Sequence, residues 1–589
     1  MEFSAASQSR LNELLDSMST EQHFGPIKLV KNRGDIVHET LAKLGFNLST
    51  IHPSTQPPPS RPFLVKLPMT RADISTADSI VRLEDARPET EVRELVGKSH
   101  EAQKVWSQLK GFKRMEILHA IFQEIMGFVS PLTMILSIEV GMTIHEAKEE
   151  IMRMVDIIEM VNKLANDTGG TMPYRSEHYD FRYGEKLHGW TREVRHIPLG
   201  VMGKITPFDS PFTSFALGVF PALAAGCTCI VKPHMDATLA TFALVRIINR
   251  AVISFQKRLQ KQEKGHSVES LMLHRSLEYI VGAFAQEDWH MIEMVLKDDR
   301  VSVWEATGGC RMGEMMRWYM GKRFKRLYLA TGTNNCAIVN GDCDLEASGA
   351  VEKIALCATK GAGQRWTNTR LVYVHRSLFD KFRDRLIKFY QTKLHVGDPL
   401  DFKTNVGPVR HDAGLNAFEN GVKDFQKDGS TLLCGGDLIF GNFVQPTVME
   451  APRINYKAVL DNDLQAPILH IAPFGERNAL GSRAAEQSSG RMPKAPNDLA
   501  EIIAAINGSQ FGFSCSVFTE NKDFFLQCAE KIKCGQVNMN RSNDAFDISS
   551  YYGGEGKTGI DRVRFQDLMQ RYTRPVKTLL PCSVEGEMS

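Results

Sequence analysis

The fold of this chain is decided by the stretch Gly200–Pro211, G-V-M-G-K-I-T-P-F-D-S-P, and by the run Phe220–Pro233, F-P-A-L-A-A-G-C-T-C-I-V-K-P. The second run predicts an apolar helix that ends at Gly226, because glycine is common just beyond a helix end. The apolar segment Cys227–Val231 follows and is typical of a parallel strand buried on both faces. From Phe63 onward strand and helix patterns alternate, which predicts an α/β fold.

Length and composition limit what the chain can be. At 589 residues it is too long for one hydrophobic core, which predicts two or three domains. The 71 Lys and Arg residues balance 69 Asp and Glu residues, so no overall field attracts nucleic acid or a membrane. The 11 cysteines include no C-x-x-C pair, which favours reduced, buried thiols. No signal, transit or transmembrane segment is seen in the sequence, and we expect a cytoplasmic protein.

A third stretch, Lys360–Arg370, reads K-G-A-G-Q-R-W-T-N-T-R. It resembles the nucleophile loop of the aldehyde dehydrogenase superfamily, G-Q-x-C-x-x-x-R. The two runs above also resemble this family, and so do later segments such as Asn507–Thr519 and Tyr551–Gly559, so the resemblance covers roughly residues 63–580. The resemblance implies an α/β fold with a Rossmann-type cofactor domain, an α/β catalytic domain and a β flap used for oligomerisation.

The resemblance also implies a division of the chain. Residues 1–62 would be an N-terminal extension with a proline-rich linker. The expected parts after it are a dinucleotide-binding domain at 63–178 and 199–331 with an insertion at about 256–266, oligomerisation segments at 179–198 and 545–582, and a catalytic domain at 332–544 with an insertion at about 480–496. Both insertions are expected to be surface loops.

Three positions that carry the family's chemistry hold other residues here. Trp366 stands where the loop has its cysteine, and an indole has no lone pair that could add to an aldehyde. Ala330, in L-A-T-G-T-N-N, stands where the family has a glutamate base. Asp209 replaces the asparagine that donates to the oxyanion, and its carboxylate would repel the developing charge. No catalytic residue is therefore expected to be intact.

The residues implied in cofactor binding are partly kept. Lys232 matches the lysine that reaches the adenosine ribose, while Met235 stands where a ribose-binding glutamate often sits. Asp463 replaces the glutamate that holds the nicotinamide ribose and is one methylene shorter.

The turn under the pyrophosphate is similar to the family pattern F-T-G-S-x-x-x-G. Here Ala306–Gly313 reads A-T-G-G-C-R-M-G, which keeps Gly308 and Gly313 and places Gly309 where serine contacts phosphate. These glycines could also serve only the packing of the helix on the strand. We expect NAD or NADP as a possible cofactor and no metal.

Three functions remain open. The first is a pseudoenzyme that serves as a structural, scaffolding or regulatory subunit. The second is an NAD(P)-dependent aldehyde dehydrogenase with a displaced nucleophile, for which Cys336 and Cys357 are the candidates. The third is a dinucleotide-binding module without turnover.

The expected partners follow from the ends and insertions of the chain. Thr573–Leu580 is apolar at alternate positions after Pro575, which predicts a strand. Family dimers exchange this strand, so we expect a homodimer or a pairing with a related subunit. The segments 1–62, 256–266 and 480–496 are candidate surfaces for protein partners, and neither nucleic acid nor a membrane is expected.

Overall fold

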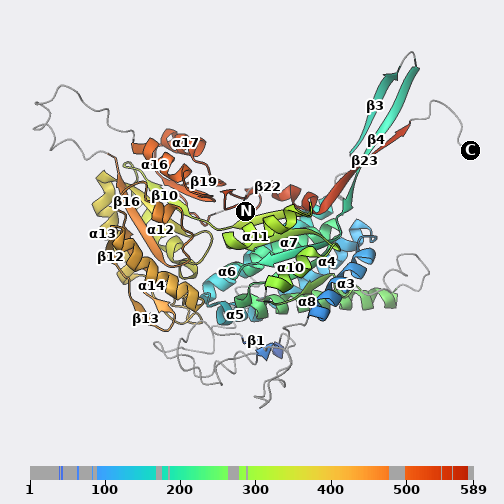
Figure 1. The fold of residues 1–589 in the computed structure, drawn as a ribbon, viewed down its shortest axis with the longest axis horizontal. Coiled ribbons are helices and arrows are strands. Elements are labelled where there is room, and N and C mark those ends of the chain that lie inside the picture. The colour runs from blue at the N-terminus through green and yellow to red at the C-terminus, as the bar shows by residue number, and fades with distance from the viewer. Residues whose placement is uncertain are drawn as a thin grey trace, which may run out of the picture.

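The computed structural model describes residues 89–581, apart from 168–174, 184–185, 263–276, 287–288, 476–497, 546 and 560–561, and a few residues before position 89. It holds two large sheets with helices packed against them, and a narrow arm of three strands that projects from the body (Figure 1). Almost all of the predicted extension at 1–62, and all of the predicted insertion at 480–496, lie outside the described residues.

The first sheet has five parallel strands in the order β7-β6-β5-β8-β9. The chain enters at β5, moves to β6 and β7 on one side, and returns to β8 and β9 on the other. The direction reverses between β5 and β8, and open α/β sheets bind ligands outside the carboxyl ends of the strands at this point. The bounds are β5 Val201–Thr206, β6 Thr228–Pro233, β7 Val281–Ala283, β8 Val301–Gly308 and β9 Arg326–Thr331.

Helices cover both faces of this sheet. Helix α7 (Pro211–Ala225) is buried along its whole length and ends at Gly226, whose φ of 97° is left-handed. The predicted helix end and the buried strand after it are thus confirmed. Helix α8 (Thr238–Gln262) packs on the same face as α7, while the opposite face carries α3 (Glu89–Trp106), α10 (Trp289–Lys297) and α11 (Cys310–Gly321). Because α8 runs to Gln262, the first part of the predicted 256–266 insertion is helix rather than loop.

One segment passes a simple test for a membrane span. Met235–Gln260, which includes most of α8, is long and apolar enough by length and composition, and the bent pair α4 (Gly111–Met126) and α5 (Val129–Val140) passes when counted together. However, 67% of the most apolar window of Met235–Gln260 is buried inside the protein, where α8 packs on α4, α5 and β7. A core helix passes the same test, so the finding is weak evidence for a membrane.

The second sheet follows directly from the first, because β9 leads through a turn at Gly332 into β10. Its seven strands are parallel except for the antiparallel edge strand β12. The loop that carries Trp366 precedes β11, so it lies at the amino ends of this sheet and faces the carboxyl ends of the first. In spatial order the strands are β12 Thr431–Cys434, β15 Thr447–Glu450, β16 Ile468–Phe474, β11 Thr369–His375, β10 Asn335–Val339, β18 Ser514–Phe518 and β19 Gln536–Met539.

The arm consists of β3 (Arg175–Tyr183), β4 (Lys186–Pro198) and β23 (Thr573–Pro581) in the antiparallel order β23-β4-β3. The predicted C-terminal strand is therefore present, but it pairs along its whole length with β4 of its own chain. The pairing follows from geometry, since the chain leaves the core at Thr573 directly beside Pro198 and the edge of β4 is available there. Completion of a sheet of a neighbouring subunit is not tested by this pairing and stays a prediction.

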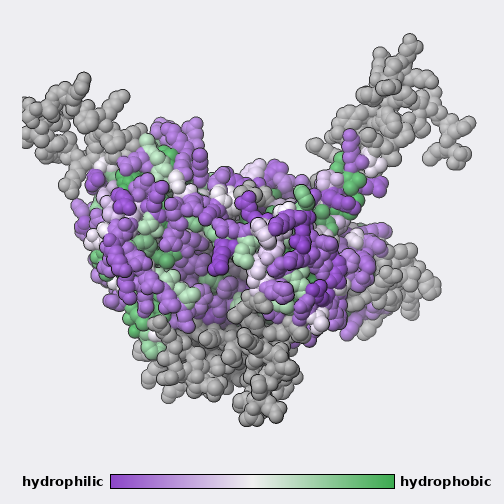
Figure 2. Space-filling model, in the orientation of Figure 1, coloured by the Kyte–Doolittle hydropathy of each residue, from purple (hydrophilic) through white to green (hydrophobic). Residues whose placement is uncertain are grey.

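The face of the molecule seen in Figure 2 is mostly hydrophilic. A hydrophobic patch at its lower left coincides with strand β13 (Leu438–Phe440), whose three side chains are all exposed.

A buried carboxylate ties two helix ends together near the first sheet. Glu139, at the end of α5, is fully buried and accepts hydrogen bonds from the amides of Leu239 and Ala240, each at 2.8 Å. These amides belong to the first turn of α8, which has no partners for them within the helix. Burial raises the pKa of Glu139 to about 7.

We expect Glu139→Ala to lower the free energy of unfolding by about 1–3 kcal/mol, because it leaves two buried amides without an acceptor. Urea unfolding measures the difference. Glu530→Ala, at an exposed position of α17 (Lys522–Lys531), is the matched control and should change stability by less than about 0.5 kcal/mol. Equal effects of the two substitutions would contradict the role assigned to Glu139.

Candidate functional site

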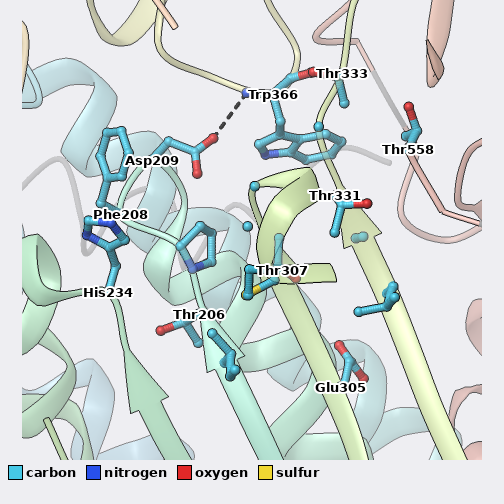
Figure 3. Close-up of a pocket in the computed structure, with 18 of the residues that line it drawn as sticks. Thr206, Phe208, Asp209, His234, Glu305, Thr307, Thr331, Thr333, Trp366 and Thr558 are labelled. Carbon is cyan, nitrogen blue, oxygen red and sulfur yellow. Dashed lines mark hydrogen bonds between the residues drawn. The ribbon is translucent and has the colours of Figure 1, made fainter. Parts of the chain in front are cut away.

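A cavity of about 510 Å³ lies where the carboxyl ends of the first sheet meet the Trp366 loop. It therefore occupies the point where the strand order reverses. Figure 3 shows that Asp209 reaches it from the segment after β5, whereas Trp366 comes from the loop before β11. Of the eight positions predicted from the sequence for catalysis and cofactor binding, all but Gly313 line the cavity: Asp209, Lys232, Gly308, Gly309, Ala330, Trp366 and Asp463.

Both polar groups of the Trp366 backbone are held. Its amide donates to Oδ2 of Asp209 at 3.1 Å, the bond drawn in Figure 3. Its carbonyl accepts from Oγ1 of Thr333 at 2.5 Å and from Nδ2 of Asn335 at 3.0 Å. Three contacts from two separate segments thus fix the backbone from which the indole projects.

The indole packs against two other rings. Its centroid lies 4.5 Å from that of Phe513 and 5.8 Å from that of Tyr552, and both pairs are edge-to-face. Such pairs stabilise by about 0.5–1.5 kcal/mol beyond the area they bury. Trp366 is nevertheless only half-buried, and the rest of its surface lines the cavity. Phe513 and Tyr552 lie in segments that resemble the family, but they were not predicted from the sequence as site residues.

Asp209 places a carboxyl group at the cavity wall, beside the amide of Trp366. Burial raises its pKa to about 6, although the amide of Trp366 and the nearby Arg365 oppose the shift. Above that pH the group is a carboxylate that already accepts from the amide of Trp366. The amide is therefore engaged by a negative group.

The residues selected for nucleotide binding fall into two groups. Lys232 lies at the end of β6, and Gly309 precedes the N-terminus of α11, where a Cβ atom would meet nothing within 4 Å. That open space and the unsatisfied amides of a helix N-terminus suit a phosphate group. Gly313 differs, because it does not line the cavity. A Cβ atom there would lie 2.7 Å from Cγ2 of Thr331, so Gly313 serves the packing of α11 on β9.

Asp463 lines the same cavity as Lys232. Burial raises the pKa of Asp463, and Arg370 and the amide of Thr333 oppose the rise. It remains an acceptor within the cavity, as expected from the sequence.

A buried ion pair that the sequence did not reveal forms part of the cavity wall. Lys204 of β5 and Glu305 of β8 are register partners, and their Nζ and Oε1 atoms lie 2.6 Å apart. The hydroxyl of Tyr572 donates to the other oxygen of Glu305. Burial alone would raise the pKa of Glu305, but Lys204 holds it below its ordinary value. The sequence held one indication of this pair, because Lys204 and Glu305 are the only charged residues of β5 and β8, two strands that are otherwise uncharged.

These features can be compared with known proteins. The model of the aldehyde dehydrogenase family matches residues 68–261, 280–490 and 494–578. The chain belongs to the aldehyde dehydrogenase family.

Family relatives share about a quarter of their residues with this chain. Aldehyde dehydrogenase family 7 member A1 of Malus domestica is 27% identical over 481 residues, which cover 81% of this chain and 83% of the relative. The α-aminoadipic semialdehyde dehydrogenase of Rattus norvegicus is 27% identical over 488 residues, covering 82% and 80%.

Solved structures show the same fold. Glyceraldehyde-3-phosphate dehydrogenase from Methanocaldococcus jannaschii, solved in complex with NADP, has a TM-score of 0.73 at 22% identity, and the match covers 88% of this chain and 98% of that one. Betaine aldehyde dehydrogenase from Staphylococcus aureus has a TM-score of 0.73 at 18% identity, covering 88% and 92%. The predicted aldehyde dehydrogenase fold is thus confirmed.

The two cysteines considered as displaced nucleophiles lie away from the cavity. Cys336 is buried in β10, and Cys357 is buried in α12 (Ala350–Thr359), where its thiol donates to the carbonyl of Thr367 at 3.4 Å. Burial raises the pKa of Cys336 to about 12 and that of Cys357 to about 11. Among the ten cysteines that the structure describes, none lines the cavity.

We expect Asp209→Asn to stabilise the protein more at about pH 8 than at about pH 4. Folding raises the pKa of Asp209 from 3.8 to about 6. Below the lower value Asp209 is protonated in both states and its burial costs no charge. As the pH rises through the higher value, the buried group becomes charged and the folded protein loses stability. Asparagine has no charge to bury and can still accept from the amide of Trp366. The expected gain near pH 8 is about 3 kcal/mol in the free energy of unfolding.

Urea unfolding at the two pH values measures this gain. The control is Asp437→Asn, an exposed position that should stay within about 0.5 kcal/mol at both. A gain for Asp209→Asn that does not change with pH would show that charge burial is not its cause.

Proposed function

We propose that this chain is a non-catalytic member of the aldehyde dehydrogenase family that serves as a structural, scaffolding or regulatory subunit. The observation that carries the proposal is the half-buried indole of Trp366 in the cavity, at the position of the family's nucleophile. An indole cannot form the covalent adduct on which aldehyde oxidation by this family depends.

The other two positions support the same conclusion. Ala330 lines the cavity and offers a methyl group where a base would activate water. Asp209 occupies the amide of Trp366, so neither group is free to donate to an oxyanion. Loss of one oxyanion donor costs about a hundred- to a thousand-fold in rate, and loss of a nucleophile about a million-fold. Three such losses in one cavity leave no route to appreciable turnover.

We further propose that NAD or NADP still binds. Lys232, the open turn at Gly308 and Gly309, and Asp463 line one continuous cavity at the point where the strand order reverses. The solved relative that was crystallised with NADP has the same fold. When bound, the nicotinamide would be a hydride acceptor. This chain's residues would hold the nucleotide without supplying the thiolate that generates a hydride donor.

The rival reading, a dehydrogenase with a displaced nucleophile, lacks a candidate group. None of the cysteines that the structure describes lines the cavity, and most of them are buried. For Cys357, reaching the cavity would require displacement of α12 from the core.

Purified protein should therefore produce no NADH or NADPH from an aldehyde panel that includes α-aminoadipic semialdehyde. Absorbance of the reduced cofactor measures this, with an active aldehyde dehydrogenase as the positive control. Turnover by this chain that disappears in Cys357→Ser or Cys336→Ser would overturn the proposal.

We propose in addition that the chain forms a homodimer, or pairs with a related subunit, through the arm. Strand β3 has one edge paired with β4 and its other edge outside the three-stranded sheet. An exposed strand edge invites pairing with another chain.

Cutting the chain after Tyr572 removes β23 and exposes β4 as well. We expect light scattering to show a dimer for the full chain and loss of that dimer, to monomer or to aggregate, for the truncated one. A full-length chain that stays monomeric at about micromolar concentration would contradict a role for the arm in assembly.

A further inference from the structure

The indole of Trp366 presents a fixed aromatic surface to the cavity. Its backbone is held at the amide and at the carbonyl, and Phe513 and Tyr552 support the ring edge-to-face. In Figure 3 the ring lies above the carboxyl ends of β8 and β9, near Thr307 and Thr331. A residue that merely filled the space would be fully buried, whereas Trp366 is half-buried and about 510 Å³ of cavity remains.

Acidic groups lie on both sides of this surface. Asp209 accepts from the amide of Trp366, and Asp463 accepts from the amide of Thr333, whose hydroxyl in turn donates to the carbonyl of Trp366. Both carboxyl groups line the cavity.

Lys232, Arg311 and Arg571 also line the cavity, and two other cationic groups of its wall are held in ion pairs. Arg365 lies 3.4 Å from Glu150, and Lys204 lies 2.6 Å from Glu305. The surroundings of the indole combine an electron-rich ring with two carboxyl groups, whose charge Arg365 and Arg370 offset in part. The ring itself still attracts a flat, positively charged ligand. Tryptophan is the side chain with the strongest attraction for a cation placed over its face, and the attraction grows when water is excluded.

We propose that Trp366 stacks on the positively charged ring of an oxidised nicotinamide, so that the cavity binds NAD⁺ or NADP⁺ more tightly than NADH or NADPH. This inference rests on the proposed retention of dinucleotide binding. The reduced ring is neutral and gains neither the cation–π attraction nor the attraction of Asp209 and Asp463. The site would then report the oxidation state of the nicotinamide pool, which gives a regulatory subunit a signal to respond to.

The test is calorimetric titration of the full-length protein with each of the four dinucleotides. We expect the oxidised form of the preferred cofactor to bind about tenfold more tightly than its reduced form. Trp366→Leu should abolish this preference. Trp318→Leu, on an exposed part of α11, is the matched control and should keep it. Stacking of indole on oxidised nicotinamide should also add a broad absorbance at wavelengths longer than those of tryptophan, absent in Trp366→Leu.

Trp366→Phe is a second variant, which keeps the test possible if Trp366→Leu does not fold. It keeps a ring with a weaker attraction for cations and should retain a reduced preference. Thermal unfolding of each variant shows whether it is folded before its titration is interpreted.

Each outcome is decisive. Equal affinity for the oxidised and reduced forms overturns the inference and leaves the proposed function standing. A preference that survives in folded Trp366→Leu overturns it as well, because the indole would not be its source. Absence of binding by all four dinucleotides overturns both the inference and the proposed retention of the cofactor. Aldehyde-dependent reduction of NAD⁺ would instead overturn the non-catalytic assignment.

Discussion

The position of the candidate site depends on one buried carboxylate, that of Glu150. Its Oε1 atom accepts from the amide of Thr213 at 2.7 Å, and its Oε2 atom lies 3.4 Å from Arg365. One side chain of α6 (Ile144–Asp167) thus holds both the start of α7, which follows Asp209, and the loop that carries Trp366. Breaking a buried pair of this kind is strongly destabilising, because the remaining charge has no partner.

Two further acids on the same face of α6 extend this hold on the loop. Glu146 accepts from the amide of Gly361 at 2.6 Å, and Glu149 lies 2.6 Å from Lys360. With the loop fixed, the amide of Trp366 donates to Asp209, and the indole packs against Phe513 and Tyr552. Trp366, Ala330 and Asp209 all line this cavity. We propose that it binds a dinucleotide without turnover.

Local sequence patterns were sufficient for part of this structure. The run Phe220–Pro233 predicts α7 and β6 because burial of a helix and a parallel strand leaves an apolar pattern that can be read locally. Family motifs identified Asp209, Ala330 and Trp366 in the sequence, and the structure places all three in the wall of one cavity. Local patterns could not predict contacts between distant segments, such as Lys204 with Glu305 or the pairing of β23 with β4, because neither partner specifies the other. Gly313 shows the same limit, since a motif glycine can serve packing instead of the ligand.

The proposed non-catalytic role requires that no cysteine thiolate be available in the cavity, and no described cysteine lines it. The most direct test of this requirement is active-site titration with p-nitrophenyl acetate, because a reactive thiolate releases p-nitrophenolate in a rapid burst and keeps the acetyl group. The account predicts no burst above that of the unfolded protein. A burst approaching one p-nitrophenolate per chain, with the acetyl group mapped by mass spectrometry to a single cysteine, would contradict it.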